Sequence, residues 1–380
     1  MRKGWEYKKL GEVSVYPNKR IQISELNPQD YVGVENLQKN KAGIVFSDKL
    51  PNTDSAIVFS PNDILIGNIR PYLKKIWLAD KSGGASGDVI IIRICTNDLM
   101  PMYLYRVLAS DKFFEYANTF TKGAKMPRGD RNAIAKFIVP LPPKSTQLAI
   151  VSELDKINEL IRLKKEQLKD FDNLAQSLFY EMFGDPVENE KGWEVKKLKD
   201  ISREIGDGLH GTPEYSEVDT GCYFINGNNL ENGTIVIKEN TKMVSEKTKA
   251  KHYIEMDDFT ILVSINGTLG KVAFYNGENV ILGKSACYIK LEAYNDKKYI
   301  FELLKSDYFK RYAESECTGT TIRNVSLKSM RNFRCPLPPL PLQRLFAQRI
   351  EQIEREKSEV QKSIQDFETL LASRMQYWFE

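Results

Sequence analysis

The chain contains one long sequence unit twice, and this duplication constrains the fold more than any other feature. The segment KGWEYKKLGEV at residues 3–13 recurs as KGWEVKKLKDI at 191–201. The segment VPLPPKSTQLAIVSELDKI at 139–157 recurs as CPLPPLPLQRLFAQRIEQI at 335–353. A period this long is typical of a duplicated domain and not of a solenoid, whose repeats are much shorter. We therefore expect two copies of one folded unit.

The two copies share a frame and diverge between its pieces. The frame consists of the KGWE start, the dipeptide Asn-Leu at 36–37 and 229–230, a helix containing Tyr103 or Tyr299, the PLPP turn and a long final helix. The stretches between these pieces align only loosely and contain β-hairpin patterns. The sequence thus predicts an α+β protein with two mixed α/β domains in tandem, each followed by one long helix. The expected segments are residues 1–142, the first domain; 143–184, the first helix; 185–338, the second domain; and 339–380, the second helix.

The two final segments have the hydrophobic pattern of coiled-coil helices. Apolar residues recur every three or four positions, and Gly184 with Pro186 predicts the end of the first helix. Each seam contains one lysine, and a polar seam residue can fix register and orientation at a cost in stability. The predicted helix-pairing residues are Ile150, Leu154, Ile157, Ile161, Lys164, Leu168 and Phe171 in the first helix, and Phe346, Ile350, Ile353, Lys357, Val360, Ile364 and Phe367 in the second.

We expect these two helices to pair with each other as an antiparallel coiled coil. Parallel pairing would require the second domain to run back along the whole first helix. Antiparallel pairing requires only that residues 184–191 lead directly into the second domain, and it predicts a rod with a domain near each end. The alternative is two independent amphipathic helices, each packed on its own domain. The narrow and continuous seams favour pairing.

Composition and charge exclude several classes of protein. The net charge of the 380 residues is only +4, so a nucleic-acid partner would need local basic patches. The five cysteines are scattered without a CxxC pair, which argues against a disulfide framework or a zinc ribbon and fits a reducing cytosol. The first ten residues lack the apolar core of a signal peptide, and no apolar run could span a membrane. We expect a soluble, cytoplasmic protein.

No catalytic or metal-binding set stands out in the sequence. The chain has only two histidines, His210 and His252, which disfavours a histidine metal site or a catalytic triad. The segment SINGTLGKV at 264–272 fails the P-loop pattern, because Ile265 replaces a glycine and Val272 a Ser or Thr. No glycine-rich loop suits a methyl donor or a dinucleotide. The hairpin DILIGNIRPYLKK has the residue types of a nuclease centre but not the usual spacing. We expect a chain without catalytic activity of its own.

Basic and polar side chains gather in equivalent loops of the two copies, where they suit contacts with DNA phosphates and base edges. For any single lysine the alternative is a solvated surface charge, and the DGLHGTPEY segment could equally be a plain turn. The predicted DNA contacts are Arg70, Lys74 and Lys75 on the first hairpin; Lys122, Lys125, Arg128 and Arg131 in the loop TKGAKMPRGDRN; Lys271, with Lys284, at the second hairpin; Thr320, Thr321, Arg323 and Asn324 in the loop CTGTTIRNVS; and His210 and Thr212 in DGLHGTPEY.

Together these motifs resemble the specificity subunit of type I restriction-modification systems, and the resemblance covers essentially the whole chain. It is carried by the duplicated PLPP turn with Gln147 or Gln343, the heptad helix after it, the KGWE start and the DGLHGTP loop. The resemblance implies two target-recognition domains, each recognising one half of a bipartite DNA site, on paired helices that set the gap between the halves. The first copy has PNKRIQI, at residues 17–23, where the second has DGLHGTP, which implies unrelated half-sites.

The resemblance also implies partners and cofactors. The partners are double-stranded DNA, two modification methyltransferase subunits and restriction-translocase subunits, with no membrane. S-adenosylmethionine and ATP are expected on those partner subunits, and no cofactor or metal on this chain. Two other function classes stay open at this point: a chain with its own DNA methyltransferase or nuclease activity, and a coiled-coil scaffold without a DNA role.

Overall fold

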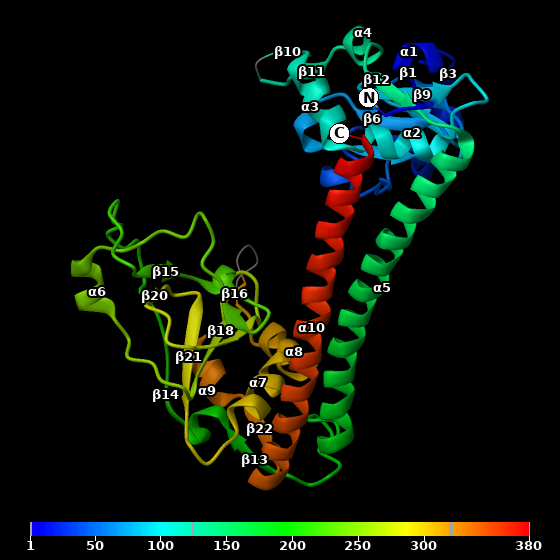
Figure 1. Ribbon diagram of the computed structural model, residues 1–380. Helices are drawn as coiled ribbons and strands as arrows, with labels where there is room; N and C mark the ends of the chain where they lie inside the picture. The colour runs from blue at the N-terminus through cyan, green and yellow to red at the C-terminus, as the bar shows by residue number, and fades with distance from the viewer. Residues whose placement is uncertain (1, 124, 319–322, 380) are drawn as a thin grey trace. The chain divides into compact units, whose positions relative to one another are not determined.

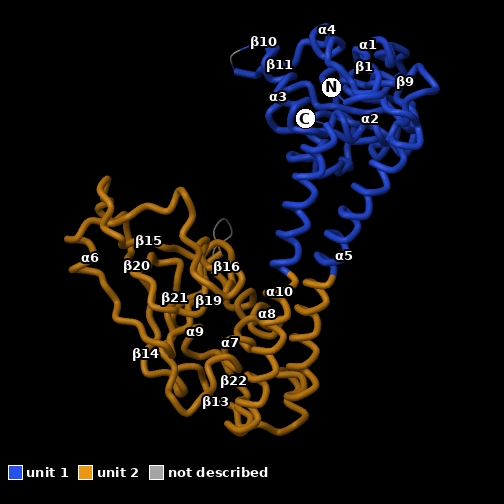
Figure 2. Tube along the Cα trace, in the orientation of Figure 1, with its two compact units in different colours: residues 1–166, 361–380 blue, residues 167–360 orange. Residues whose placement is uncertain are grey.

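A computed structural model describes residues 2–123, 125–318 and 323–379 of the chain. The chain forms two compact units: unit 1 contains residues 1–166 and 361–380, and unit 2 contains residues 167–360 (Figure 2). Each unit thus holds one globular domain and one half of each long helix. The boundaries expected from the sequence, at residues 142, 184 and 338, separate each domain from a whole helix, whereas the two units divide each helix between them. These boundaries stay a prediction.

The domain of unit 1 is a mixed arrangement of short strands and helices (Figure 1). One sheet has the order β2-β9-β6-β7, a second has the order β3-β5-β8-β4, and β1–β12 and β10–β11 form two-stranded pairs. Its elements are β1 (Glu6–Lys9), α1 (Leu10–Val13), β2 (Ser14–Val15), β3 (Arg20–Gln22), η1 (Ile23–Glu25), η2 (Pro28–Asp30), β4 (Tyr31–Val32), η3 (Lys39–Lys41), β5 (Ser55–Phe59), β6 (Ile64–Gly67), η4 (Pro71–Leu73), β7 (Ile76–Leu78), β8 (Gly83–Ala85), β9 (Val89–Ile94), α2 (Pro101–Leu108), α3 (Asp111–Thr119), β10 (Thr121–Lys122), β11 (Arg128–Gly129), α4 (Arg131–Ile134) and β12 (Ile138–Leu141).

The domain of unit 2 repeats this plan, with the sheet β14-β21-β18-β19 in the place of β2-β9-β6-β7. The pairs β13–β22, β15–β20 and β16–β17 complete its strands. Its elements are β13 (Glu194–Lys197), η5 (Leu198–Ile201), β14 (Ser202–Asp207), β15 (Tyr223–Ile225), η6 (Gly227–Asn229), β16 (Leu230–Glu231), β17 (Thr234–Ile235), α6 (Glu246–His252), β18 (Thr260–Ser264), β19 (Val272–Phe274), β20 (Val280–Leu282), β21 (Ala286–Leu291), α7 (Lys297–Lys305), α8 (Asp307–Ser315), α9 (Leu327–Asn332) and β22 (Arg334–Leu337).

The central sheet of each domain is buried on both faces. In unit 1, Ile64 and Ile66 of β6 pack with α2 and α3, whereas Leu65 packs against residues of the second sheet. In unit 2, Ile261 of β18 packs with α7, and Leu262 packs with β15 and β20. A sheet covered on both sides needs strands that are apolar throughout, which is why these hairpin sequences show continuous apolar runs.

The recurring sequence pieces make the same hydrogen bonds in both domains. The strand after KGW pairs antiparallel with the strand of the PLPP segment, as β1–β12 in unit 1 and β13–β22 in unit 2. The buried hydroxyl of Tyr103 donates to the carbonyl oxygen of Pro140 (3.0 Å), and that of Tyr299 donates to Pro336 (2.6 Å). These bonds tie α2 in unit 1 and α7 in unit 2 to the strand that leads into the long helix.

A buried glutamine completes the same joint. The side-chain oxygen of Gln147 accepts from the backbone amide of Met100 (2.9 Å), and that of Gln343 accepts from Asp296 (3.0 Å). Each side-chain amide then donates to a proline carbonyl of its own PLPP turn, at 2.9 and 2.8 Å. A buried amide must be satisfied in this way, so the spacing PLPP…Q recurs because the domain-to-helix turn needs it.

The two long helices are α5 (Lys144–Phe183) and α10 (Leu340–Phe379), and they pack against each other in antiparallel orientation. In unit 1, Glu153 accepts from the indole of Trp378 at 3.0 Å and forms an ion pair with Arg374. In unit 2, Lys357 forms an ion pair with Asp172. Residue numbers rise along α5 as they fall along α10, so the antiparallel prediction is confirmed and the alternative of two independent helices is wrong.

The predicted seam positions all lie at buried or half-buried places. Lys357 is half-buried and bound to Asp172, as expected for a seam lysine that fixes register. Lys164 is also half-buried. The buried members are Ile150, Leu154, Ile157 and Ile161 of α5 and Phe346, Ile350, Ile353, Val360 and Ile364 of α10, while Leu168, Phe171 and Phe367 are half-buried.

The last turns of the helices close the cores of the domains. In unit 2, Phe183 at the end of α5 packs against Tyr299 with ring centroids 4.7 Å apart, and against Phe346 at 5.1 Å. In unit 1, Phe379 at the end of α10 packs against Tyr103 at 5.9 Å. The core of unit 2 is thus completed by the end of α5, the helix that follows the first domain. The core of unit 1 is completed by the end of α10, the helix that follows the second domain.

Replacing the aromatic ring that ends α5 tests this packing. Phe183→Ala should lower the free energy of unfolding by about 3–5 kcal/mol, because it removes a buried ring and leaves a cavity. Urea unfolding followed by circular dichroism measures the loss. The matched control is Leu174→Ala on the exposed face of the same helix, which should cost well under 1 kcal/mol. Equal losses in the two variants would contradict the packing role of Phe183.

A second prediction concerns the carboxyl group of Glu302 in α7, which is nine-tenths buried. Burial raises the pKa of Glu302, although Lys305 lies 3.2 Å away and opposes the shift. A group with a raised folded-state pKa stabilises the fold at low pH, and that stability is lost as the pH rises through the folded value. Glu302→Gln, which does not titrate, should therefore have a higher urea midpoint than the unchanged chain at pH 7.5, with the difference closing toward pH 4.5.

The control for this prediction is Glu239→Gln, which changes an exposed carboxylate of the same domain. Its urea midpoint should follow that of the unchanged chain at both pH values. A difference for Glu302→Gln that is independent of pH would show that burial of the charge is not the cause.

Candidate nucleic-acid interface

In unit 1, two loops that are far apart in the sequence lie side by side. One is the hairpin loop between β6 and β7, and the other is the segment that ends in β11. Ile69 forms a β-bridge with Arg128, and the backbone amide of Arg70 donates to the carbonyl of Pro127 (2.7 Å). The sequence predicted two separate basic clusters here, and the structure joins them into one surface.

Most of the predicted basic residues of unit 1 already have acidic or backbone partners. These contacts orient the side chains at the surface, and exposed ion pairs of this kind contribute little to stability. Arg70 and Lys125 are exposed. The contacts are Lys74 with Asp111 (2.9 Å), Lys122 with Asp130 (2.7 Å), Arg128 with both carboxylate oxygens of Asp88 (3.0 and 3.2 Å), Lys75 with the carbonyl of Val34 (2.6 Å) and Arg131 with the carbonyl of Gly87 (2.8 Å).

Unit 2 joins the equivalent loops in the same way. Asn266 of the β18–β19 loop forms a β-bridge with Asn324, and the amide of Gly267 donates to the carbonyl of Arg323 (2.9 Å). Arg323 is exposed and lies 3.6 Å from the carboxylate of Glu314. Thr320 and Thr321 lie outside the described residues. The two domains therefore hold different side chains on one shared loop junction.

The DGLHGTP loop packs beside the β20–β21 connection. Leu209 forms a parallel bridge with Gly283, and a side chain at Gly208 would clash with the carbonyl of Leu282, only 2.0 Å from the ideal Cβ. The imidazole of His210 lies 2.7 Å from the carboxylate of Asp207, and both His210 and Thr212 are exposed. Lys284 is exposed on the neighbouring connection. The amide of Ile265, at the start of the β18–β19 loop, donates to the carbonyl of Ser285 in that connection (3.0 Å), which brings this loop near the hairpin.

The stretch at 17–23 in unit 1 is built differently. It contains β3, which pairs with β5, and Arg20 donates to the hydroxyl of Ser55 (2.8 Å). The two domains therefore differ in backbone arrangement at this place as well as in side chains, in line with the expectation of two unrelated half-sites.

Sequence reasoning missed a polar cleft in unit 2 that lies next to Lys271. The cavity has a volume of about 420 Å³ and combines amide, ammonium and aromatic groups. The Asn-Leu dipeptide, which recurs in a stretch where the two copies otherwise diverge, was the available signal. The residues that line the cleft are Tyr215, Phe224, Asn226, Asn228, Asn229, Lys238, Asn240, Thr241, Lys242 and Lys271.

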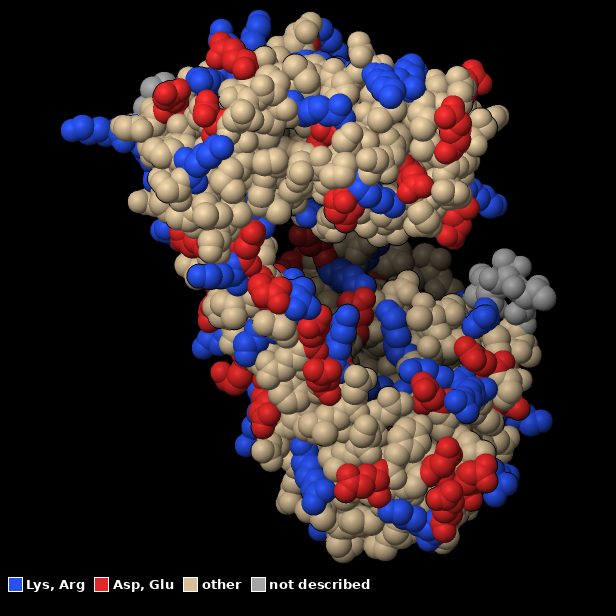
Figure 3. Space-filling view, turned by 90° about the vertical axis from the view of Figure 1, so that its right-hand side faces the viewer, with Lys and Arg blue, Asp and Glu red and all other residues tan. Residues whose placement is uncertain are grey.

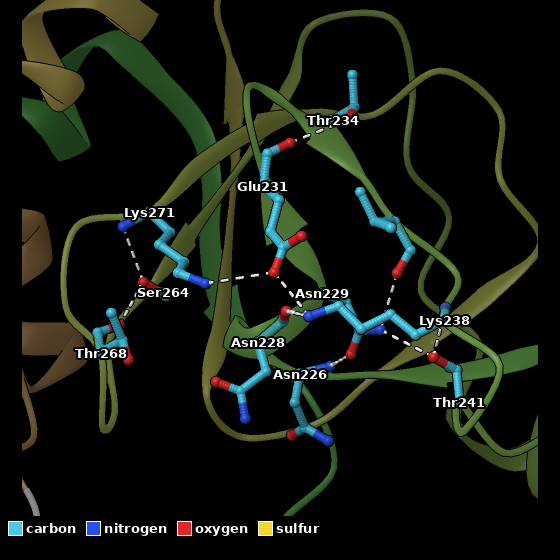
Figure 4. A network of polar contacts seen from close by, with 11 residues as sticks. Asn226, Asn228, Asn229, Glu231, Thr234, Lys238, Thr241, Ser264, Thr268 and Lys271 are labelled. Carbon is cyan, nitrogen blue, oxygen red and sulfur yellow. Dashed lines mark hydrogen bonds and ion pairs between the residues drawn. The ribbon is translucent and has the colours of Figure 1, made fainter. Parts of the chain in front are cut away.

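Figure 4 shows how the charges of this cleft are held. The carboxylate of Glu231 binds Lys238 at 2.6 Å and lies 3.8 Å from the ammonium group of Lys271. The hydrogen bond from Lys238 lowers the pKa of Glu231, so the carboxylate stays charged between two cations. Lys238 also donates to the backbone carbonyl of Asn228 (2.9 Å). The cleft therefore carries excess positive charge beside neutral amides, a combination that suits phosphates and base edges.

The surface charge is mixed in sign. In the view of Figure 3, Lys and Arg side chains are interspersed with Asp and Glu side chains, with no uniformly basic surface on the face drawn. Binding of nucleic acid to this face would therefore require local basic surfaces, because no overall basic charge is present on it. Among the residues that the structure describes, no group of three or more His, Cys, Asp or Glu side chains could hold a metal ion. None of the described helices is long and apolar enough to cross a membrane.

Both halves of the chain match one protein family. The model of the type I restriction modification DNA specificity domain covers residues 2–170 and again residues 190–366. The chain belongs to this family. It is a type I restriction-modification specificity subunit with two tandem recognition domains, as the resemblance predicted.

Curated relatives agree with this assignment. The MjaVIII specificity subunit of Methanocaldococcus jannaschii is 22% identical over 346 residues, covering 84% of this chain and 80% of the relative. The MjaIX specificity subunit of the same organism is 22% identical over 378 residues, covering 90% and 85%. These relatives are named as specificity subunits and not as catalytic chains.

Solved structures share the fold along the whole chain. A chain from a study of complex assembly and conformational transition in a type I restriction-modification system superposes with a TM-score of 0.66 and 20% identity, covering 100% of this chain and 98% of the other. The type I restriction-modification S subunit from M. genitalium gives a TM-score of 0.50 at 14% identity, covering 98% of this chain and 95% of the other.

Proposed function

We propose that each domain recognises one half of a bipartite DNA site. The observation that carries this proposal is the shared loop junction, which has the same backbone frame in both domains but different side chains. A common frame with divergent loops is what two recognition domains for two different sequences require. Family membership favours this function over the two alternatives considered from the sequence, a catalytic chain and a scaffold without a DNA role.

Those proposed DNA contacts that the structure describes lie on the loop surfaces of the two units. Exposed cations contact phosphates and position the duplex, while amide and hydroxyl groups contact base edges. On binding DNA, the lysines and arginines of these ion pairs leave their carboxylate partners and bind phosphates. The proposed contacts are Arg70, Lys74, Lys75, Lys122, Lys125, Arg128 and Arg131 in unit 1, and His210, Thr212, Lys271, Lys284, Thr320, Thr321, Arg323 and Asn324 in unit 2.

The remaining parts of the proposal concern the helices and the partners. The paired helices α5 and α10 set the number of unspecified base pairs between the half-sites, and two modification methyltransferase subunits dock on the helices and domain frames. Those subunits bind S-adenosylmethionine and methylate DNA, restriction-translocase subunits join them and use ATP, and this chain supplies recognition without catalysis or a cofactor. The assembly works on DNA in the cytoplasm.

Domain exchange tests the assignment of half-sites. Replacing residues 1–140 with the first domain of another family member should change one half-site and leave the other intact, because each domain makes its own base contacts. The measurement is the map of methylated adenines in a host that produces the exchanged chain with its methyltransferase subunit. The reciprocal exchange of the second domain is the matched control. A change in both half-sites from a single exchange would rule out independent recognition.

Helix length tests the spacing. One extra heptad in α5, between residues 165 and 172, and one in α10, between residues 357 and 368, keep the seam in phase and add about 10 Å. At ~3.4 Å per base pair, the gap between half-sites should grow by about three base pairs. A heptad in only one helix, which leaves the extra seam residues unpaired, should reduce methylation. An unchanged gap in the double insertion would contradict the role of the helices.

A further inference from the structure

In the turn η6 of unit 2, the buried side chain of Asn229 holds the backbone in place, and Asn228 is exposed at the surface. The buried side chain of Asn229 accepts from the amide of Asn226 (3.0 Å) and donates to the carbonyl of Val236 (2.9 Å) and to the hydroxyl of Thr241 (3.1 Å). Four consecutive residues are thereby locked in one conformation, with the third of them, Asn228, at the surface.

Unit 1 contains the same turn. The buried side chain of Asn36 accepts from the amide of Gly33 (2.7 Å) and donates to the carbonyl of Val45 (3.0 Å). The backbone bonds match as well, since Val45 donates to the carbonyl of Asn36 (2.9 Å) just as Val236 donates to that of Asn229 (2.7 Å). The exposed residue at the equivalent position is Glu35.

Each turn packs against the last residue of the first hairpin strand of its domain, Ser264 of β18 in unit 2 and Gly67 of β6 in unit 1. In unit 2, Gly227 of the turn faces Ser264, and a Cβ on Gly227 would lie only 2.8 Å from that of Ser264. In unit 1 the small residue lies on the other partner, because Gly67 of the hairpin faces Val34 of the turn. In unit 2 the glycine is in the turn, and in unit 1 it is in the strand. One glycine in each pair lets the turn lie at the same position in both domains although the sequences diverge.

The exposed side chains at these positions are available for a ligand. Neither the amide group of Asn228 nor the carboxylate of Glu35 makes a hydrogen bond within the part of the chain that the structure describes. The carboxylate of Glu35 lies over Gly33 of its own turn, and Asn228 lines the polar cleft (Figure 4). One lysine binds the backbone of each turn. Lys238 donates to the carbonyl of Asn228 (2.9 Å), and Lys75 donates to that of Val34 (2.6 Å), the residue before Glu35. A phosphate bound by these lysines would place base edges next to the displayed side chains.

We propose that Asn228 and Glu35 are matched base-recognition residues, one for each half-site. In the major groove, asparagine pairs with N6 and N7 of adenine, and a carboxylate accepts from N4 of cytosine. The proposal therefore assigns an adenine in the second half-site to Asn228 and a cytosine in the first to Glu35. Asn229 and Asn36 are positioning residues that hold the two turns. This inference rests on the proposed function and adds the residues that determine specificity.

The test uses the chain together with its methyltransferase subunit in a host without other adenine methylation, with methylated adenines mapped on the host genome. Asn228→Ala should reduce the preference for adenine at one position of the second half-site by about tenfold or more, and leave the first half-site unchanged. Asn228→Glu should move that position toward cytosine. Glu35→Ala should relax one cytosine position of the first half-site only.

The matched control is Asn276→Ala. Asn276 is an exposed asparagine in the β19–β20 turn, after the end of β19, whereas Lys271 of the cleft lies before its start. The methylated motif of this variant should be unchanged. A variant that methylates nothing is assayed as the purified complex on duplexes with each of the four base pairs at the position in question. If the variant complex binds all four duplexes with similar affinity, the proposal is supported. If it still ranks the four duplexes in the order found for the unchanged complex, the proposal is contradicted.

Two outcomes separate this inference from the function beneath it. If the unchanged complex methylates a bipartite site and both alanine variants keep that motif, the residue assignment is wrong and the proposed function stands. If the unchanged complex has no bipartite site, the proposed function is wrong, and the inference fails with it.

Discussion

The exchange of helix ends between the two halves of the sequence is the contact on which the rest of the structure depends. The core of unit 2 is closed by Phe183, at the end of the helix that follows the first domain. The core of unit 1 is closed by Phe379, at the end of the helix that follows the second domain. Neither domain can therefore reach its full core without helix pairing, so folding of the domains and formation of the coiled coil are thermodynamically linked.

Buried polar side chains explain which parts of the sequence recur. Buried polar groups tolerate little change because each one must keep its partners. Gln147 and Gln343 fix the PLPP turn, and Asn36 and Asn229 fix the surface turn. Residues at the loop surfaces have no such restriction. One frame can therefore carry two loop sets of different chemistry, which is the property that recognition of two half-sites requires.

The sequence predicted the elements that depend on local pattern and missed those that depend on tertiary contact. The seams of α5 and α10 follow from heptad periodicity, and the duplicated domains follow from the repeat. By contrast, the bridge between Ile69 and Arg128 joins segments that no local pattern connects. The same holds for Lys238, which looks like an ordinary loop lysine in the sequence. Its contacts with Glu231 and Asn228 hold it in the polar cleft. The ion pairs of Lys74 with Asp111 and of Arg128 with Asp88 were also invisible, because their acidic partners lie 37 and 40 residues away in the chain.

Under the proposed function, those ion pairs bear on how the chain discriminates between DNA sequences. Non-specific affinity comes from cations that neutralise phosphates. Here Arg128 is bound to Asp88, and Lys74 and Lys41 share Asp111. Each contact with a phosphate must first separate such a pair, so the net gain per cation is smaller than for a free lysine or arginine. The net charge of only +4 also supplies little long-range attraction to the phosphate backbone. Base contacts then account for a larger share of the binding free energy, which raises the ratio of specific to non-specific affinity.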